Sequence, residues 1–261
     1  MKLPLLSGKF WQSGAFMLGK LRDIVLGFAL LMLLWYAAYV SIDRNVMPSP
    51  ILVIRALPDL LNHNIFAHLA HSLYRVLMSL GVSMLAGLFI GILAAGKSFG
   101  KILDPFIYVM YPIPRIAFLP VIMLVFGFGD ASKIIMIAIV VVFPIILVVR
   151  DGVRDIPREL YNAITCLGAS KLQVFYVITL PWAAASVFST LRVSLGISFA
   201  ILFFTETYGT NYGMGFFIMD MWQRINYVMM FAGIVTLGIL GFFLFVAIDV
   251  VESFVLRWKK L

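Results

Sequence analysis

The hydrophobic residues of this chain are gathered in six long blocks that are separated by shorter polar segments. A helix needs roughly 17–25 predominantly apolar residues to cross a bilayer, and the blocks reach or approach this length. They do not alternate apolar and polar residues as the strands of a membrane β-barrel do. The blocks are Ile24–Val40, Val76–Ala95, Phe106–Phe126, Ile134–Val149, Val187–Phe204 and Tyr227–Ile248. The pattern therefore predicts an all-α membrane protein with about six transmembrane helices.

The composition agrees with a membrane protein. The chain has 261 residues, of which 63% are hydrophobic and 12% are charged, whereas soluble domains are nearer half apolar and a quarter charged. The first block has no small-residue cleavage site before Ser41, so we expect a retained span and not a signal peptide. The expected organisation is a basic cytoplasmic N-terminal segment (1–23), a transmembrane domain (24–256) and a cytoplasmic C-terminal tail (257–261).

The net charge of +8 follows the predicted topology. If the N-terminus is cytoplasmic, thirteen Lys and Arg residues lie on the cytoplasmic side, and the outer side carries only Arg44, Arg55, Lys133 and Arg224. This asymmetry is the positive-inside rule, and it predicts that both termini lie on the cytoplasmic side of the membrane. The basic balance therefore predicts contact with anionic lipid and none with nucleic acid. Cys166 is the one cysteine, so an intrachain disulfide is excluded.

Two segments depart from plain membrane helices. Pro112, Pro114 and Pro120 interrupt the third block, and the carbonyl groups that they free must face protein or water, because lipid cannot satisfy them. We therefore expect this span to line a path. Before the second block, residues 57–72 have apolar positions at helical spacing, which predicts an amphipathic helix near the outer surface.

Gly87 and Gly91 lie four residues apart in the second block. This spacing gives a helix a small-residue face on which another helix can pack closely. The partner is either another helix of the same chain or a second copy of the chain, and the sequence leaves both open.

Arg115 lies about ten residues into the third block, and an ionisable residue at that depth is costly and marks function by default. With Tyr111 and Phe118 on adjacent turns, it is placed to contact an anionic or planar solute. A structural ion pair or snorkelling is the alternative. Glu206, at the outer end of the fifth block, is the candidate partner or gate residue. The candidate translocation path consists of Tyr111, Pro112, Pro114, Arg115, Phe118 and Glu206.

The sequence supports no chemistry on a substrate. Residues 91–98 match the phosphate-binding P-loop pattern, but they end a membrane helix and are not followed by a soluble α/β domain. His63, His68 and His71 are a possible metal set, but interfacial histidines on an amphipathic helix are the favoured interpretation. No nucleophile–base or metalloprotease pattern is present, so we expect no catalytic residue, no metal and no cofactor bound by this chain.

A polar segment between the fourth and fifth blocks carries the clearest motif. Residues 159–181 predict a helix, a glycine and a second helix within the loop 150–181. Ala163, Gly168, Ile178 and Leu180-Pro181 are spaced as in the "EAA" loop of ABC-transporter permeases of the binding-protein-dependent import type. The same order of further motifs, from Pro48-Ser-Pro50 through Leu103-Asp104-Pro105 to Phe143-Pro144, resembles the nitrate, sulfonate, taurine and bicarbonate branch of that family.

This resemblance implies a type I ABC importer permease-like fold with a cytoplasmic coupling-helix loop. It also implies a second copy of the permease, two cytoplasmic ATPase subunits that use the ATP, and an extracytoplasmic solute-binding protein. Asn162 stands at the family's glutamate position and Ile164 at its second alanine, so the docking contacts shift toward Glu159 or the basic flank. The residues that the resemblance assigns to ATPase docking are Glu159, Asn162, Ala163, Gly168, Ala169, Ser170, Leu180 and Pro181.

The implied function is the translocation path for a small nutrient, either a sulfonate-, taurine- or nitrate-like anion or a thiamine-precursor-like heterocycle. The alternative is a stand-alone secondary carrier or channel. A carrier typically has inverted repeats with matching broken helices, and this sequence has one proline-broken span with no counterpart.

Overall fold

The computed structural model describes residues 8–42 and 46–256, and within these ranges every regular element is helical. The chain ends 1–7 and 257–261, which include the predicted C-terminal tail and part of the N-terminal segment, lie outside the described residues, as does Arg44. The elements are α1 (Gly8–Ser41), α2 (Pro50–Ala56), η1 (Leu57–His63), α3 (Ile65–Ala95), α4 (Lys97–Met110), η2 (Arg115–Phe118), α5 (Leu119–Phe126), α6 (Asp130–Arg154), α7 (Arg158–Cys166), α8 (Lys171–Val174), η3 (Phe175–Thr179), α9 (Leu180–Glu206), α10 (Met214–Gln223) and α11 (Tyr227–Val255).

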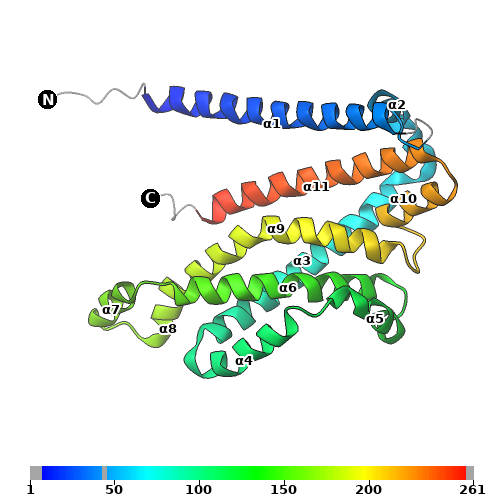
Figure 1. The fold of residues 1–261 in the computed structure, drawn as a ribbon. Helices are drawn as coiled ribbons and strands as arrows, with labels where there is room; N and C mark the ends of the chain where they lie inside the picture. Colours follow the sequence, from blue (N-terminus) through cyan, green and yellow to red (C-terminus); the bar gives the residue numbers. More distant parts are fainter. Residues whose placement is uncertain (1–7, 43–45, 257–261) are drawn as a thin grey trace.

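Five of the six predicted blocks lie within continuous helical segments, and the third lies in helices on both sides of a break at residues 111–114 (Figure 1). Among the described residues, four helical segments are long and apolar enough to cross a membrane: α3, α6, α11 and the continuous run of α8, η3 and α9. The pair α4 and α5 forms a fifth, bent candidate span, and Val25–Ser41 of α1 is a shorter apolar helix. The all-α membrane architecture is therefore confirmed.

The third block is not a single straight span. Its first helix, α4, begins at Lys97, and the axes of the two halves differ by 84° across a break at residues 111–114. Pro112 and Pro114 lie in this break, and a proline disfavours helix at the residue before it. The predicted interruption is confirmed, and α4 begins before the apolar block because the helix runs from Lys97 through Pro105.

The predicted amphipathic helix at residues 57–72 is also wrong. Asn64 has a left-handed backbone (φ 52°), which separates the short helix η1 from α3. Asparagine is among the few residues that adopt this conformation readily. The membrane helix α3 therefore starts at Ile65, before the apolar block that predicted it.

The core lies where α3, α6 and α9 pack together, side by side in Figure 1. On α3, a Cβ added to Gly87 would lie 2.5 Å from Ile145 of α6, and one added to Gly91 would lie 2.7 Å from Val149. The two glycines therefore form the surface on which α6 packs. Of the two partners left open by the sequence, the structure shows the intrachain one.

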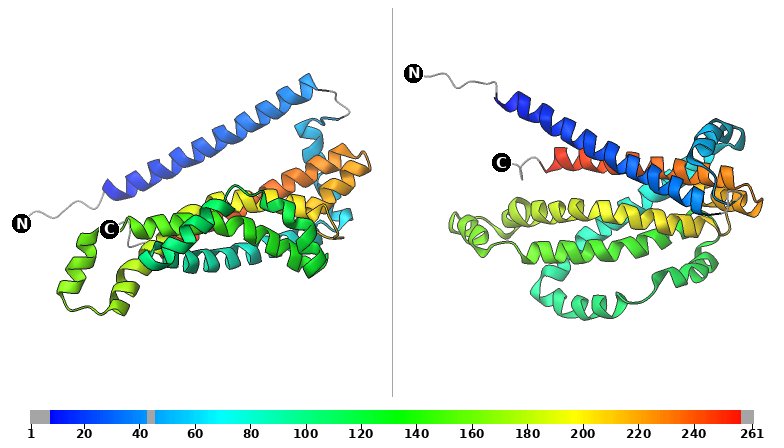
Figure 2. Two further views of the ribbon diagram at one scale, coloured as in Figure 1. Left: turned by 60° about the horizontal axis from the view of Figure 1, so that its bottom comes forward. Right: turned by 45° about the horizontal axis from the view of Figure 1, so that its top comes forward.

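Helix α1 lies apart from α3, α6 and α9 over most of its length, as Figure 2 shows. Trp35 joins it to the rest of the chain, since its ring stacks on Phe231 of α11 at 5.8 Å between centroids and its Nε1 donates to the carbonyl of Pro48 at 3.2 Å. An apolar groove of about 1080 Å³ remains between α1 and α11.

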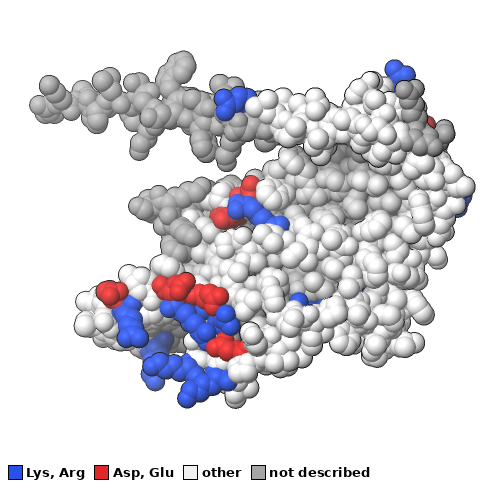
Figure 3. Space-filling model, viewed as in Figure 1, with Lys and Arg blue, Asp and Glu red and all other residues white. Residues whose placement is uncertain are grey.

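The two ends of the bundle differ in character. We call the end that holds α7 and α8 the loop end. We call the end that holds α10 the network end, after the network of polar contacts described below. In the face drawn in Figure 3, charged side chains gather mainly around the loop end, and the flank between the two ends is almost free of them. This distribution suits a chain whose flank faces lipid.

Candidate functional site

The loop between α6 and α9 folds as the sequence predicts, with a helix, a glycine and a second helix. Gly168 has φ +82°, which a residue with a Cβ adopts at a steric cost. Its N–H donates to the carbonyl of Thr165 at 3.0 Å, and the N–H of Ala169 donates to that of Ile164 at 3.3 Å. This pair of bonds is a Schellman motif, which ends α7 and turns the chain toward α8.

The second half of the loop is fixed by its own cap. The Ser170 hydroxyl accepts from the Gln173 N–H at 3.4 Å, while the Gln173 side chain accepts from the Ser170 N–H at 2.8 Å. This capping box begins α8, which continues through the π-helical turn η3 into α9. Helix α9 starts at Leu180 with Pro181 in its first turn, as predicted.

The loop is open to its surroundings. Neither α7 nor α8 contains a buried residue, and Leu167 at the tip is 86% exposed. Leu160 and Leu172 are exposed as well. Of the predicted docking residues, Glu159, Asn162, Ala163, Gly168 and Ser170 are exposed, and Ala169, Leu180 and Pro181 are half-buried. The first six of these residues thus lie in the projecting loop, and Leu180 and Pro181 lie at its base, where α9 begins.

The bend between α4 and α5 holds most of the predicted path residues. Tyr111, Pro112, Pro114 and Phe118 are exposed there, and Arg115 is half-buried. Tyr111 and Pro112 also line a pocket of about 820 Å³ between α4 and α6.

Arg115 supports this bend from within. Its Nη2 donates to the carbonyls of Met110 and Tyr111 at 3.1 and 3.2 Å, and its guanidinium carbon lies 3.9 Å from the centroid of the Phe143 ring. These carbonyls are released where the helix breaks, so the arginine supplies the donors that the chain lacks. Its buried Nε has no hydrogen-bond partner among the described residues.

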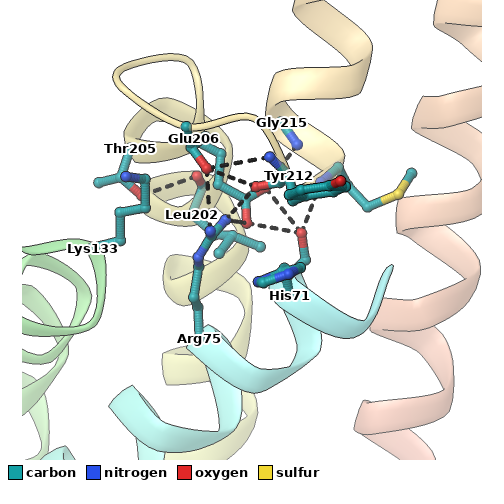
Figure 4. A network of polar contacts seen from close by, with 12 residues as sticks. His71, Arg75, Lys133, Leu202, Thr205, Glu206, Tyr212 and Gly215 are labelled. Carbon is teal, nitrogen blue, oxygen red and sulfur yellow. Dashed lines mark hydrogen bonds and ion pairs between the residues drawn. The ribbon is translucent and has the colours of Figure 1, made fainter. Parts of the chain in front are cut away.

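Glu206 lies in a different place from Arg115. Its side chain is 0% exposed at the network end, where it pairs with Arg75 of α3 at 2.7 Å. The Ser72 hydroxyl and the Gly215 N–H also donate to this carboxylate, at 2.8–2.9 Å and 2.8 Å. The expectation that Glu206 is the partner of Arg115 is therefore wrong. Figure 4 shows these groups converging from α3, α9 and the start of α10.

Arg75, which the sequence does not single out as a site residue, is the centre of this network. Its guanidinium donates four hydrogen bonds, to Asp130, to Glu206, to the Tyr212 carbonyl and to the Thr210 hydroxyl. The sequence did contain a signal. His68, Ser72 and Arg75 recur at helical spacing on α3, which puts three polar side chains on one face of a membrane helix.

A glycine lets the connection between α9 and α10 close over the carboxylate. Gly213 has φ +138°, and a Cβ there would lie 2.4 Å from the carboxyl carbon of Glu206. Its N–H donates to Nδ1 of His68 at 3.1 Å. His71 instead stacks on Tyr212, and His63 lies against Phe217. The described part of the chain contains no group of three His, Cys, Asp or Glu residues placed for a metal ion.

Two further cations have partners that the sequence does not reveal. Lys133 is 0% exposed, and its Nζ donates to the carbonyls of Phe128 and Gly209 at 2.7 and 3.3 Å. Arg192 pairs with Asp249 and Glu252 and so joins α9 to α11. Neither partnership is visible in sequence because each joins elements far apart along the chain.

The sequence is similar to those of several permease proteins of known transport systems. The chain is 30% identical over 221 residues to a putative aliphatic sulfonates transport permease protein, SsuC, of Bacillus subtilis, covering 84% of this chain and 80% of the relative. It is 28% identical to the taurine transport system permease protein TauC of Escherichia coli, covering 88% and 87%. It is also 28% identical to the formylaminopyrimidine transport permease protein ThiX of Halalkalibacterium halodurans, covering 89% and 94%.

The fold is similar to that of a chain of the MetNI methionine ABC transporter solved in inward-facing conformations. The TM-score is 0.58 at 19% sequence identity, and the match covers 75% of this chain and 96% of the other. The model of the family "Binding-protein-dependent transport system inner membrane component" matches residues 83–257, which is more than half of the chain. Such a system works with a solute-binding protein and a separate ATPase, and the permease binds no cofactor. The chain therefore belongs to this family, as a multi-pass, non-catalytic permease component of an ABC importer.

Proposed function

We propose that two copies of this chain form the translocation path for a small nutrient in a prokaryotic inner membrane, and that residues 150–181 couple each copy to one of two cytoplasmic ATPase subunits. Both chain termini then lie on the cytoplasmic side, together with the loop end. The domain limits expected from the sequence (1–23, 24–256 and 257–261) belong to this proposal.

The observation that carries the proposal is the projecting loop at the loop end. Leu160, Leu167 and Leu172 are exposed on a surface that no part of the described chain covers. Apolar side chains gathered on a polar loop mark a contact with another protein. Because Gly168 and Ser170 fix both short helices, the surface is formed before a partner binds.

The proposed path runs along the α4–α5 bend. Tyr111, Pro112, Pro114 and Phe118 face away from the core, and Arg115 holds the bend that presents them. Glu206 is fully buried in the network, so we place it behind the path as a support. In an alternating-access cycle, ATP binding draws the ATPase subunits together, the loops follow, and the bend reorients the central cavity.

The solute belongs to one of two chemical classes. The named solutes of the relatives are aliphatic sulfonates and taurine on one side and formylaminopyrimidine on the other. The half-buried guanidinium of Arg115 at the bend suits either a small anion or a hydrogen-bonding heterocycle. Selectivity then rests largely on the solute-binding protein.

A pair of substitutions at Gly168 tests the coupling assignment. Valine at φ +82° costs about 1–2 kcal/mol and turns the loop away from its fixed shape, whereas asparagine tolerates the left-handed conformation. We expect Gly168→Val to reach the membrane normally but to abolish ATP-dependent uptake, and Gly168→Asn to keep most of it. Uptake is measured with radiolabelled taurine, methanesulfonate, nitrate and formylaminopyrimidine, with the binding protein present.

Wild-type uptake by Gly168→Val would overturn the assignment of the loop. Uptake that persists in ATP-free vesicles under an ion gradient would instead favour a stand-alone carrier.

A further inference from the structure

A cluster of charges at the loop end joins the first half of the bent pair to the end of α6. One carboxylate oxygen of Asp104 on α4 accepts from Nη1 of Arg150 at 2.9 Å, and the other accepts from Nη2 of Arg154 at 2.7 Å. Both arginines lie on α6, about one turn apart. A single acid is thus held by two cations of one neighbouring helix, through hydrogen bonds strengthened by charge.

Arg154 extends this cluster to a third helix. The same Nη2 donates at 2.7 Å to the carbonyl of Ala94, in the last turn of α3, where helix carbonyls lack partners. Gly100 of α4 makes room for this approach, because an added Cβ would lie 2.7 Å from both the Ala94 oxygen and Arg154 Nη2. The contact is therefore built into the packing of α3, α4 and α6.

The chain leads directly from this cluster into the docking loop. Helix α6 ends at Arg154, and α7 begins at Arg158. Between them, Ile156 is 5% exposed, and its N–H donates to the Val153 carbonyl at 3.4 Å. Because the connection between α6 and α7 is short and is anchored by Ile156, a displacement of α7 also displaces the end of α6.

The other side of the cluster faces the proposed path. Asp104 and Arg150 line the same pocket of about 820 Å³ as Tyr108, Tyr111 and Pro112. Tyr108 is 83% exposed, so it reports on the surface of α4 that faces this pocket. Figure 3 shows the charges of the loop end gathered close together beside α7.

We infer that Asp104 is a positioning residue for transport, which carries the movement of the α7–α8 loop to α4 through Arg150 and Arg154. When the bound ATPase displaces α7, the end of α6 moves with α7. Because Asp104 is held by two arginines of α6, α4 and the bend then follow α6. The inference rests on the proposed function, because it requires the α7–α8 loop to be the ATPase contact. It assigns to the Arg150–Asp104–Arg154 cluster the link between that contact and the path.

The experiment follows α4 directly and needs no knowledge of the solute. In a parent chain that carries Cys166→Ser and Tyr108→Cys, the one cysteine lies on α4. The complex with its ATPase is reconstituted, and the rate of labelling by a polar maleimide is measured without nucleotide and with ATP plus vanadate. We expect the parent to show two different rates, and Asp104→Asn to reduce the ratio between them by roughly tenfold, within the usual range of couplings between sites.

Two comparisons separate this role from a merely structural one. Asp104→Asn should bind the ATPase and hydrolyse ATP as the parent does, and Asp104→Glu should restore the nucleotide response. Asp151→Asn is the matched control, since Asp151 also binds Arg150, at 2.8 Å, but lies on α6 and does not reach α4. Arg154→Gln removes one of the two cations that bind Asp104, and it should also lose the change in labelling rate with nucleotide.

The inference is overturned if Asp104→Asn keeps the full nucleotide response, if it loses the ATPase from the complex, or if the parent labels at one rate under both conditions. Gly168→Val, measured in the same way, tests the proposed function separately. If Gly168→Val loses the response and Asp104→Asn keeps it, the loop assignment stands and only the role of Asp104 fails.

Discussion

At the scale of single residues, Arg75 and Glu206 show how charge is tolerated within a hydrophobic bundle. Their side chains are 3% and 0% exposed, and the arginine donates four hydrogen bonds to neighbouring groups. A buried ion pair contributes little net stability by comparison with apolar residues, but removal of one partner leaves an uncompensated charge. The pair therefore fixes which helices meet at the network end.

Replacement of Glu206 by alanine should destabilise the chain strongly. It leaves Arg75 buried without one of its two acids, at a cost of about 3–5 kcal/mol. Thermal unfolding in mild detergent, followed by size-exclusion chromatography, measures the effect. Arg224→Ala is the control, because its partner Asp220 lies on the same helix and its side chain is 67% exposed, so the loss is about 0–1 kcal/mol. Equal losses of stability in the two variants would contradict the structural role of the network.

Single residues also mark the limit of what the sequence predicts. The helical spacing of His68, Ser72 and Arg75 is visible in the sequence, but Glu206 lies 131 positions beyond Arg75. From the sequence alone, Arg115 is as plausible a partner for Glu206 as Arg75 is. Pairing of distant charges is decided by the packing of whole helices, which the spacing along one helix does not contain.

At the scale of elements, the contact of α3 with α6 organises the bundle. Gly87 and Gly91 are buried against Ile145 and Val149, so the two helices approach more closely than larger side chains allow. The sequence predicts this face, the proline break and the helix–glycine–helix loop, because each depends on neighbouring residues. It does not predict the 84° bend, which depends on how α5 packs on α6.

Two identical substitutions on α3 test this contact. Gly91→Ala adds a methyl group 2.7 Å from Val149, which forces a shift and costs about 1–3 kcal/mol. Gly81→Ala has nothing within 4 Å of the new Cβ, so it should leave stability unchanged or raise it by up to about 1 kcal/mol through helix propensity. Thermal stability in detergent compares them. If both variants melt at the wild-type temperature, the close contact of α3 and α6 is not important for stability.

At the scale of the whole molecule, one copy leaves large apolar surfaces uncovered. None of the residues in the most apolar 18-residue window of α11 is buried. Exposed apolar residues also follow the α4–α5 bend, with Tyr108 83% and Leu124 82% exposed. A chain that spans a membrane covers such surfaces with lipid, and in the proposed dimer a second copy also covers part of them. In the proposed assembly, the exposed leucines of the polar loop face neither lipid nor the second copy, and an ATPase subunit covers them.

The most direct test is a pull-down of the tagged chain from its native membrane in mild detergent, with quantitative mass spectrometry of the proteins that accompany it. The account predicts an ABC ATPase subunit in a one-to-one ratio with the permease, a solute-binding protein in smaller amount, and loss of the ATPase when Gly168 is replaced by valine. Recovery of the chain alone, under conditions that preserve other membrane complexes, would contradict it.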